Sequence, residues 1–294
     1  MPEEAAFLGK VAAGSRRVKI DQIGSTVQGR PIQLVQIAEP GPRPAPATAA
    51  GSVVLFICSQ HGDEPAGREG CLSRIRDLAF SRDAEIVRML RATTAVFVPT
   101  ANPDGRVADT RGNANGVDIN RDHIALETPE ARATAKVFKD YKPDIVHDLH
   151  EDGTTPPYYE KDVTWLWPRN LNVADRVHDE SEKLSCERRV QIELATTFSR
   201  NLEPLKRKLV YFGGADNQAP KPEEVLNQPP CGYRLTSAQF AQVQQKLELH
   251  DVHSWSTGGG RFVPLAQQAR GLIPLLLDAK GQYKITTAER VSTC

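Results

Sequence analysis

A histidine and a glutamate stand three residues apart, directly after the apolar run Val53 to Cys58. The segment after that run reads QHGDE and contains His61 and Glu64. Imidazole nitrogen and carboxylate oxygen both suit zinc, and a catalytic zinc site takes three protein ligands and leaves one position for water. His61 and Glu64 are therefore candidate ligands, although this spacing alone is more common in a solvated turn between a strand and a helix.

A pair of histidines, His147 and His150, lies in the segment DIVHDLH, residues 144–150. Side chains alternate across a strand, so Val146, Asp148 and His150 share one face and His147 takes the other. His150, at the end of this strand, could complete a set of two histidines and a glutamate. His147 is expected to pack or hydrogen-bond structurally.

Residues 102–121 contain NPDG followed by RGNANGVDINR. The Asn-Pro, Asp-Gly and Asn-Gly steps favour tight turns. Such a loop could hold the guanidinium groups of Arg111 and Arg121 in place, and the planar fork of arginine matches a carboxylate with two hydrogen bonds. The alternative is an exposed loop without function.

An acid follows the last apolar run, Ile273 to Leu277, which is expected to be a strand. A carboxylate at the end of a strand and near a metal could act as a general base. Asp278 is therefore a candidate catalytic residue, but it could equally cap the next turn.

Strand-like and helix-like segments alternate along the chain, which predicts an α/β fold with helices on both faces of a sheet. Ligands of such sheets gather at the carboxyl ends of the strands. Residues 201–235 are expected to form a long loop over the site rather than a linker, so residues 1–294 are predicted to be one domain. The expected strands are 33–37, 53–58, 94–98, 144–149 and 273–277, and the expected helices are 66–79, 83–91, 129–141 with Thr128 as N-cap, 172–199, and 236–249 with Thr236 or Ser237 as N-cap.

Composition limits the classes of partner. The 294 residues include 37 Lys and Arg and 37 Asp and Glu, so no net charge favours nucleic acid or an anionic membrane. No apolar window is long enough to cross a bilayer, and the N-terminus MPEEAAFLGK does not resemble a signal peptide. The five cysteines are scattered without a CxxC pair, which indicates reduced thiols in a cytoplasmic protein, with Cys58 in the core.

Taken together and in this order, the segments resemble the zinc carboxypeptidase family. The resemblance begins at IGSTVQGRPI, residues 23–32, and continues through HGDEPAG, NPDG, RGNANGVDINR and DLH. It implies a single domain with a central mixed, mostly parallel β-sheet flanked by helices on both faces. It also implies one zinc ion per chain, bound by His61, Glu64 and His150.

The resemblance implies further roles in the hydrolysis of an amide bond next to a free carboxylate. Asp118 would hydrogen-bond a ligand histidine and fix its tautomer. Arg111 would stabilise the oxyanion together with zinc, while Asn120 and Arg121 would bind the substrate carboxylate. Zinc-activated water would attack the carbonyl, and a carboxylate would carry the proton to the departing amine.

Two positions depart from the family pattern. The residue aligned with the family's catalytic glutamate is Asp278, whose side chain is shorter by about 1.5 Å. The tyrosine that digestive members carry before a Gly-Gly turn is absent, and His253 could donate the same hydrogen bond. Both departures concern the substrate and the proton transfer more than the metal.

The leading hypothesis is a metallocarboxypeptidase that acts on a peptide or an N-acyl amino acid with a free carboxylate. One alternative is a deacylase of N-acyl amino acids of the succinylglutamate desuccinylase and aspartoacylase type. Another is a non-catalytic zinc-binding module that recognises carboxylates, which the change at Asp278 motivates.

Overall fold

The computed structural model describes residues 1–43, 45, 51–151, 163–166, 209–212, 230–281 and 283–293. The helix expected over 172–199 lies outside these residues, as does most of the loop expected over 201–235. All of the candidate site residues lie within them.

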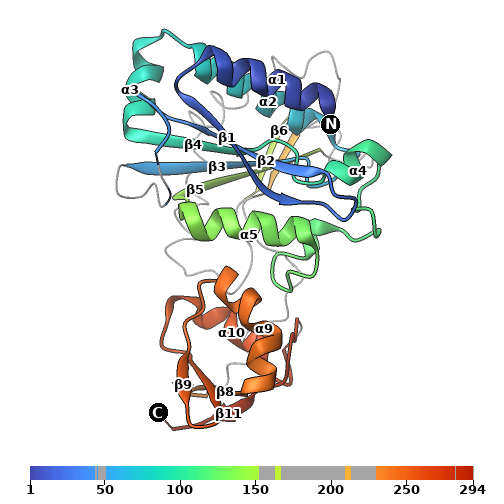
Figure 1. Ribbon diagram of the computed structural model, residues 1–294, viewed down its shortest axis with the longest axis vertical. Coiled ribbons are helices and arrows are strands. Elements are labelled where there is room, and N and C mark those ends of the chain that lie inside the picture. Colours follow the sequence, from blue (N-terminus) through green and yellow to red (C-terminus); the bar gives the residue numbers. More distant parts are fainter. Residues whose placement is uncertain are drawn as a thin grey trace.

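A seven-stranded sheet forms the larger part of the molecule, with strand order β1-β2-β4-β3-β5-β7-β6 (Figure 1). The pairs β4–β3, β3–β5 and β7–β6 are parallel and the other pairs are antiparallel, so the sheet is mixed as predicted. The parallel pairing of three neighbours, β4, β3 and β5, places their carboxyl ends at one edge. The strands are β1 Val18–Ser25, β2 Pro31–Ile37, β3 Ser52–Cys58, β4 Thr93–Val98, β5 Ile145–Glu151, β6 Val163–Leu166 and β7 Leu209–Phe212.

Helices cover both faces of this sheet, which confirms the predicted α/β architecture. On one face Leu8, Ile75 and Leu90 bring α1, α2 and α3 into a common apolar cluster. On the other face Val137 and Tyr141 of α5 pack against the sheet. The helices are α1 Pro2–Gly14, α2 Pro65–Phe80, α3 Ala84–Ala92, α4 Pro103–Ala108 and α5 Pro129–Tyr141, and a short 3-10 helix, η2, covers Ile119–Arg121.

Strand β3 lies between these two clusters and is apolar on both sides. Its Val53, Leu55 and Ile57 join the cluster under α5, whereas Phe56 and Cys58 join the cluster under α2. Burying one such aliphatic or aromatic side chain stabilises the fold by about 1.5–3 kcal/mol. The continuous apolar run of β3 is therefore explained by its central position.

Local capping follows the predicted helix starts. Thr128 accepts a hydrogen bond from the backbone N–H of Ala131 and caps α5. Thr236 and Gln239 form a reciprocal capping box at the start of α9, Ser237–Leu249. Both N-cap predictions are confirmed, because a hydroxyl side chain can satisfy a backbone N–H that has no partner within the first turn.

A second, smaller unit contains a four-stranded antiparallel sheet of order β11-β8-β10-β9 and has its own apolar core. Figure 1 shows it beyond α5, with α9 against that helix. The imidazole Nε2 of His250 lies 2.8 Å from the carbonyl oxygen of Ile124 at this contact. The one-domain organisation stays a prediction. The further elements are β8 Gly232–Thr236, β9 Trp255–Thr257, β10 Gly260–Pro264, η5 Gln268–Gly271, α10 Ile273–Leu277 and β11 Glu289–Val291.

Two predictions about the C-terminal half are wrong. Residues Ile273–Leu277 form the short helix α10, not a strand, and all five are buried. A five-residue apolar run has no period that separates a buried strand from a buried helix. The segment 201–235 is not one continuous loop, because it contains β7, Leu209–Phe212, and most of β8.

The prediction of reduced cysteines is also wrong for Cys58 and Cys71, which form a disulfide between β3 and α2. Cys231 is disulfide-bonded as well. The sequence separation of 13 residues hides this proximity, since only the packing of α2 on β3 brings the two sulfurs together. The core position of Cys58 is confirmed, with 0% exposure. Cysteine usage therefore no longer supports a cytoplasmic location.

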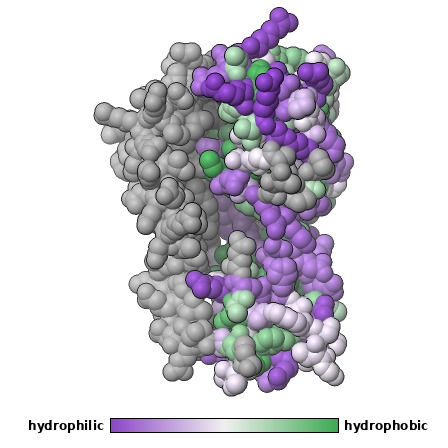
Figure 2. Space-filling view, turned by 90° about the vertical axis from the view of Figure 1, so that its left-hand side faces the viewer, coloured by the Kyte–Doolittle hydropathy of each residue, from purple (hydrophilic) through white to green (hydrophobic). Residues whose placement is uncertain are grey.

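The coloured part of the molecular surface in Figure 2 is mostly hydrophilic, with apolar residues gathered over its lower portion. Among the helices of the described residues, none combines the length and the apolar character that crossing a membrane would require.

Candidate metal centre

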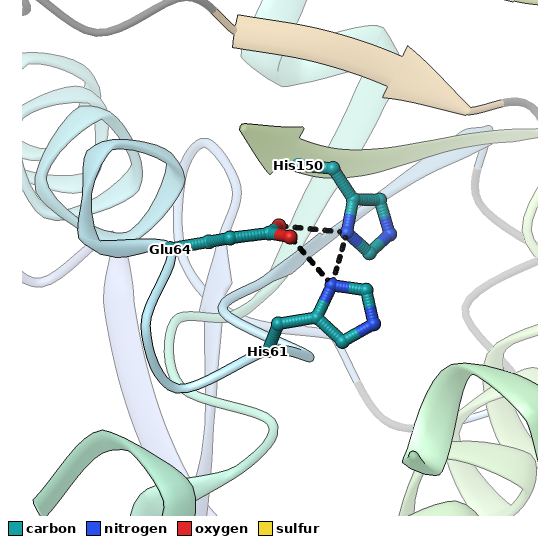
Figure 3. A group of neighbouring side chains, drawn as sticks. All are labelled: His61, Glu64 and His150. Atoms are coloured by element: carbon teal, nitrogen blue, oxygen red, sulfur yellow. Dashed lines mark hydrogen bonds and ion pairs between the residues drawn. The ribbon is translucent and has the colours of Figure 1, made fainter. Parts of the chain in front are cut away.

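Three candidate ligands converge at the carboxyl edge of the parallel strands. His61 lies in the loop after β3, Glu64 immediately precedes α2, and His150 lies on β5, and Figure 3 shows the three side chains pointing toward one another (Figure 3). Their ligand atoms all lie within 4.8 Å of one another, and they are the one such group in the part of the chain that the structure describes. The Nδ1 atoms of His61 and His150 lie 2.7 and 2.9 Å from the two carboxylate oxygens of Glu64.

The loop that carries His61 is held by the neighbouring strand. Ser59, just after β3, has a left-handed φ of 52°, which turns the chain away from the sheet. The backbone N–H groups of Ala101 and Asn102 donate to the carbonyl oxygens of Cys58 and Ser59 at 2.9 and 3.1 Å. The segments that leave β3 and β4 thus stay paired, and this pairing directs His61 toward β5.

Gly62, between the two motif ligands, lies against the backbone of α4. A Cβ atom there would lie 1.9 Å from the carbonyl carbon of Gly105 and 2.2 Å from the nitrogen of Arg106. Its own N–H donates to the carbonyl oxygen of Thr110 at 2.9 Å. The motif therefore requires glycine at this position because two backbone segments meet there.

Replacing Gly62 by alanine is expected to lower the free energy of unfolding by about 3 kcal/mol, the upper end of the usual cost of overpacking. It should also weaken zinc binding, because His61 would have to move with the loop. Thermal unfolding and bound zinc measure the two effects. The matched control is Gly9→Ala in α1, where a Cβ meets nothing within 4 Å. Equal effects of the two substitutions would contradict this account of Gly62.

Three carboxylates, those of Glu64, Asp118 and Asp148, surround the two histidines of the site. Burial raises the pKa of Glu64, but hydrogen bonds from His150 and His61 outweigh it and lower the value to about 2. Burial lowers the pKa of His150, but the charge and hydrogen bond of Asp148 outweigh it and, with Glu64, raise the value to about 10. The same carboxylates that favour imidazolium would favour a cation between the ligands. Two nitrogens and one carboxylate that face a common point fit zinc.

Asp118 and Arg111 adjoin the ligands. Asp118 Oδ1 lies 3.1 Å from Nε2 of His61, the ring nitrogen that does not face Glu64. Burial raises the pKa of Asp118, but the hydrogen bond from His61 outweighs it and holds the value well below its usual range. Arg111 donates to Asp118 Oδ2 through Nε and Nη2 at 3.0 and 2.9 Å, and its Nη1 lies 3.6 Å from Glu64 Oε1. The Arg111 side chain is 49% exposed, so its guanidinium reaches from solvent to the ligands.

The structure also brings Asn120 to the ligands and Arg121 close to Asp118. The side-chain Nδ2 of Asn120 lies 3.2 Å from Nε2 of His150. Arg121 is exposed, and its positive charge contributes to the low pKa of Asp118. Asp118 caps η2 by accepting from the backbone N–H of Asn120 at 3.0 Å. This short helix therefore sets the spacing between the acid, the amide and the second arginine.

The turn-rich loop rests on two buried acids. Asn113 donates to Glu130 at 3.0 Å, and the N–H of Gly116 donates to the carbonyl oxygen of Asn113 at 2.8 Å, in a turn where Gly116 has a φ of 75°. Asp104 accepts from Arg30 at 2.5 Å. The positive φ of Gly116 explains the glycine of the NANG step, and the two acids tie this loop to the rest of the domain through Asn113 and Arg30.

Asp278 and His253 lie in the smaller unit and do not join this group. Asp278 accepts hydrogen bonds from the hydroxyl of Tyr233 at 2.8 Å and from Nε of Arg290 at 2.7 Å. The backbone N–H of His253 donates to Oε1 of Gln267 at 2.8 Å. Among the contacts of the described residues, neither side chain reaches His61, Glu64 or His150. Their proposed roles in catalysis and substrate binding stay predictions.

The structure adds three residues that the sequence reasoning did not assign to the site: Asp148, Gln60 and His123. Asp148 Oδ2 lies 3.1 Å from Nε2 of His150. Gln60 bonds Asp148, and His123 bonds Gln60. The alternation of β5 already placed Asp148 on the face of His150, which was a usable signal. Gln60 and His123 are separated by 63 residues and left no signal in the sequence.

His147 occupies the opposite face of β5, as the alternation predicts. Its ring stacks on Phe56 of β3 with centroids 4.8 Å apart, and Phe56 stacks in turn on Phe97. Burial lowers the pKa of His147 to about 4. The side chain therefore packs structurally and is uncharged in the folded protein at neutral pH.

Acid is expected to destabilise the protein through His147. Its pKa is lower in the folded state, about 4, than in the unfolded chain, about 6.5, so only the unfolded state binds this proton between those values. The free energy of unfolding therefore carries no penalty from His147 above pH 6.5. It falls by about 3 kcal/mol as the pH decreases from 6.5 to 4. His147→Phe keeps the stack on Phe56 and has no proton to bind. In denaturant unfolding, its free energy of unfolding should therefore lose about 3 kcal/mol less than that of the wild type between pH 6.5 and 4. An equal loss of the free energy of unfolding in the wild type and in His147→Phe would contradict this role of His147.

The fold and the convergent side chains define an α/β protein with a candidate metal centre, and comparison with known proteins identifies its family. The family model for zinc carboxypeptidases matches residues 5–154, about half of the chain, so the chain belongs to the zinc carboxypeptidase family. This region contains His61, Glu64 and His150.

Individual relatives agree with this family. The chain is 31% identical over 135 residues to carboxypeptidase 2 of Trichophyton tonsurans, covering 44% of this chain and 25% of that protein. It is 34% identical over 122 residues to carboxypeptidase E of Caenorhabditis elegans, covering 36% and 25%. The match thus spans about a quarter of these relatives. A metallo-carboxypeptidase structure from Pseudomonas aeruginosa is similar with 25% identity and a TM-score of 0.51, over 62% of this chain and 47% of that one.

Proposed function

We propose that this chain is a metallocarboxypeptidase that hydrolyses the amide bond next to a free carboxylate. The observation that carries the proposal is the convergence of His61, Glu64 and His150 below the half-exposed guanidinium of Arg111. Three protein ligands leave room for water and substrate, which is typical of a catalytic zinc site and not of a structural one. Membership of the zinc carboxypeptidase family supports the same activity.

Zinc, when bound by His61, Glu64 and His150, would polarise a carbonyl oxygen and lower the pKa of water. Arg111 contributes a fixed positive charge, because Asp118 holds its Nε and Nη2 while Nη1 points toward the ligands. A preorganised cation of this kind stabilises an oxyanion more in the transition state than in the ground state. Asp118 in turn keeps the Nε2 proton of His61 directed away from the metal position.

The substrate is a peptide or an N-acyl amino acid with a free carboxylate. The two arginines and Asn120 supply donors for that carboxylate at the rim of the site, and the guanidinium fork can bind both of its oxygens. The related Pseudomonas structure contains (2-guanidinoethylmercapto)succinic acid, a ligand with carboxylates and a guanidino group. Peptides that end in arginine therefore belong among the first substrates to test.

The competing function is a zinc-binding module that recognises carboxylates without hydrolysis. The specific observation in its favour is the engagement of Asp278, the acid proposed for proton transfer, by Tyr233 and Arg290 within the smaller unit. The catalytic assignment of Asp278 requires its carboxylate to reach the ligands.

The deciding experiment loads the protein with zinc and incubates it with peptides of varied C-terminal residue and with N-acyl amino acids. Release of a single C-terminal residue, followed by mass spectrometry, supports the carboxypeptidase. Release only from N-acyl amino acids supports the deacylase. Asp278→Ala and Asp278→Glu run in parallel. Binding of the same peptides without turnover, with activity appearing in Asp278→Glu, would establish the binding module instead.

A further inference from the structure

A chain of hydrogen bonds leads from the ligand His150 into the protein. Asp148 Oδ2 lies 3.1 Å from Nε2 of His150. Both carboxylate oxygens of Asp148 lie 2.7 Å from Nε2 of Gln60. Oε1 of Gln60 lies 2.7 Å from Nε2 of His123. His150 and Gln60 are 1% exposed and Asp148 is 7% exposed, so water competes little for these bonds.

The chemistry of Asp148 sets the direction of every bond in this chain. A carboxylate only accepts hydrogen bonds, so each group that faces it must donate. Nε2 of His150 therefore carries its proton, and in the neutral ring Nδ1 then has a free electron pair. Nδ1 is the atom that faces Glu64 and His61, at 2.9 and 3.1 Å. The tautomer that Asp148 selects is thus the one that can bind a metal.

The same rule orients Gln60. Because its amide nitrogen must face Asp148, its amide oxygen faces His123 and can only accept. Burial lowers the pKa of His123, so the ring is neutral and has one N–H to give. That proton stands on Nε2. The backbone carbonyl of Gln60 is held too, by Nδ2 of Asn102 at 3.2 Å. Gln60 is therefore fixed at both ends of its side chain and at its backbone.

We propose that Gln60 and His123 are positioning residues of the metal centre, which hold the Asp148 carboxylate and through it keep His150 in the tautomer that presents Nδ1 to the metal. This inference deepens the proposed function by naming residues that prepare the site, and it rests on the metal-dependent activity proposed above. Gln60 precedes the ligand His61 in the chain, but the hydrogen bonds described for the two side chains run to Asp148 and to each other, not to a ligand side chain.

Removing the donor at Gln60 leaves Asp148 free to rotate away from His150. Groups that orient a metal ligand affect metal affinity by about 10- to 100-fold. Gln60→Met keeps the length of the side chain and removes both of its hydrogen bonds, so we expect zinc affinity to fall by about tenfold, the lower end of that range. His123→Phe should have a smaller effect in the same direction. His123→Gln, which can still donate to Gln60, should restore affinity.

The experiment measures two quantities in the full chain. Zinc affinity is determined by competition with a chromophoric chelator. The tautomer of His150 in the metal-free protein is read at a pH above its raised pKa of about 10, where the ring is neutral. Long-range proton–nitrogen correlations after histidine labelling report it, with His150→Gln identifying the signal. Gln36→Met is the matched control, because Gln36 is also a glutamine with 1% exposure whose amide donates to a backbone carbonyl, that of Arg43.

The expected result is an Nε2–H signal for His150 in the wild type and in Gln36→Met. In Gln60→Met a Nδ1–H population should appear and zinc affinity should fall. An unchanged tautomer and affinity in Gln60→Met would overturn the inference. If that variant fails to fold, the inference is tested by the pair His123→Phe and His123→Gln, and equal zinc affinities in the two would overturn it.

Zinc affinity and the tautomer of His150 can both be measured without substrate turnover. The positioning role and the proposed carboxypeptidase activity can therefore be rejected independently of each other. Loss of the tautomer preference in a protein that hydrolyses no peptide would keep the positioning role and reject the carboxypeptidase. If the protein is an active carboxypeptidase and Gln60→Met changes neither the tautomer of His150 nor the zinc affinity, the carboxypeptidase is kept and the positioning role is rejected.

Discussion

Glu64→Gln is expected to weaken zinc binding by more than about 100-fold, because even residues that only orient the ligands change affinity by about 10- to 100-fold. Glu64 is the one anionic member of the ligand group, and its carboxylate faces the Nδ1 atoms of both histidines. Glutamine keeps the shape and removes the charge. Zinc content after dialysis and chelator competition measure the loss.

Glu69→Gln is the matched control for this prediction. Glu69 lies in α2, which Glu64 immediately precedes; it pairs with Arg68 and is 46% exposed, against 12% for Glu64. The control should bind zinc as the wild type does. Retention of stoichiometric, tightly bound zinc in Glu64→Gln would show that the metal centre lies elsewhere.

Arg111→Met is expected to lower kcat by about 10²- to 10³-fold, the usual cost of removing one donor to an oxyanion. The methionine keeps part of the apolar stem and removes the guanidinium that Asp118 orients toward the ligands. Zinc content should stay near the wild-type value, because Arg111 is not a ligand. Arg111→Lys should recover little activity, since a point charge cannot bond Asp118 with two nitrogens and also reach the ligands.

Arg76→Met serves as the control for Arg111→Met. Arg76 also pairs with an aspartate, Asp77, and its 53% exposure is close to the 49% of Arg111. Steady-state kinetics on the best substrate of the panel should separate the two variants. An equal kcat in the wild type and Arg111→Met would remove Arg111 from the reaction.

The sequence indicated the ligands because each lies beside an expected strand and the segments together resemble one family. His61 and Glu64 follow a strand whose apolar run is unmistakable, and His150 ends another. Carboxyl ends of neighbouring parallel strands meet at one edge of a sheet, so the two segments had to approach each other. Asp118, Arg111 and Asn120 came from a loop whose turn residues had no other evident purpose, and the structure places all three beside the ligands.

The amino-acid sequence by itself thus determined the α/β class and the helix caps, because each depends on periodicity or on turn chemistry within one segment. It indicated the three ligands through their places beside expected strands and through the family resemblance of the segments that carry them. Tertiary structure alone decided that Ile273–Leu277 is helical, that Cys58 meets Cys71, and that Asp278 pairs with Arg290. It alone joined His123 to Gln60. These outcomes depend on which distant segments pack together, and a short apolar run or a single polar residue does not specify its partner.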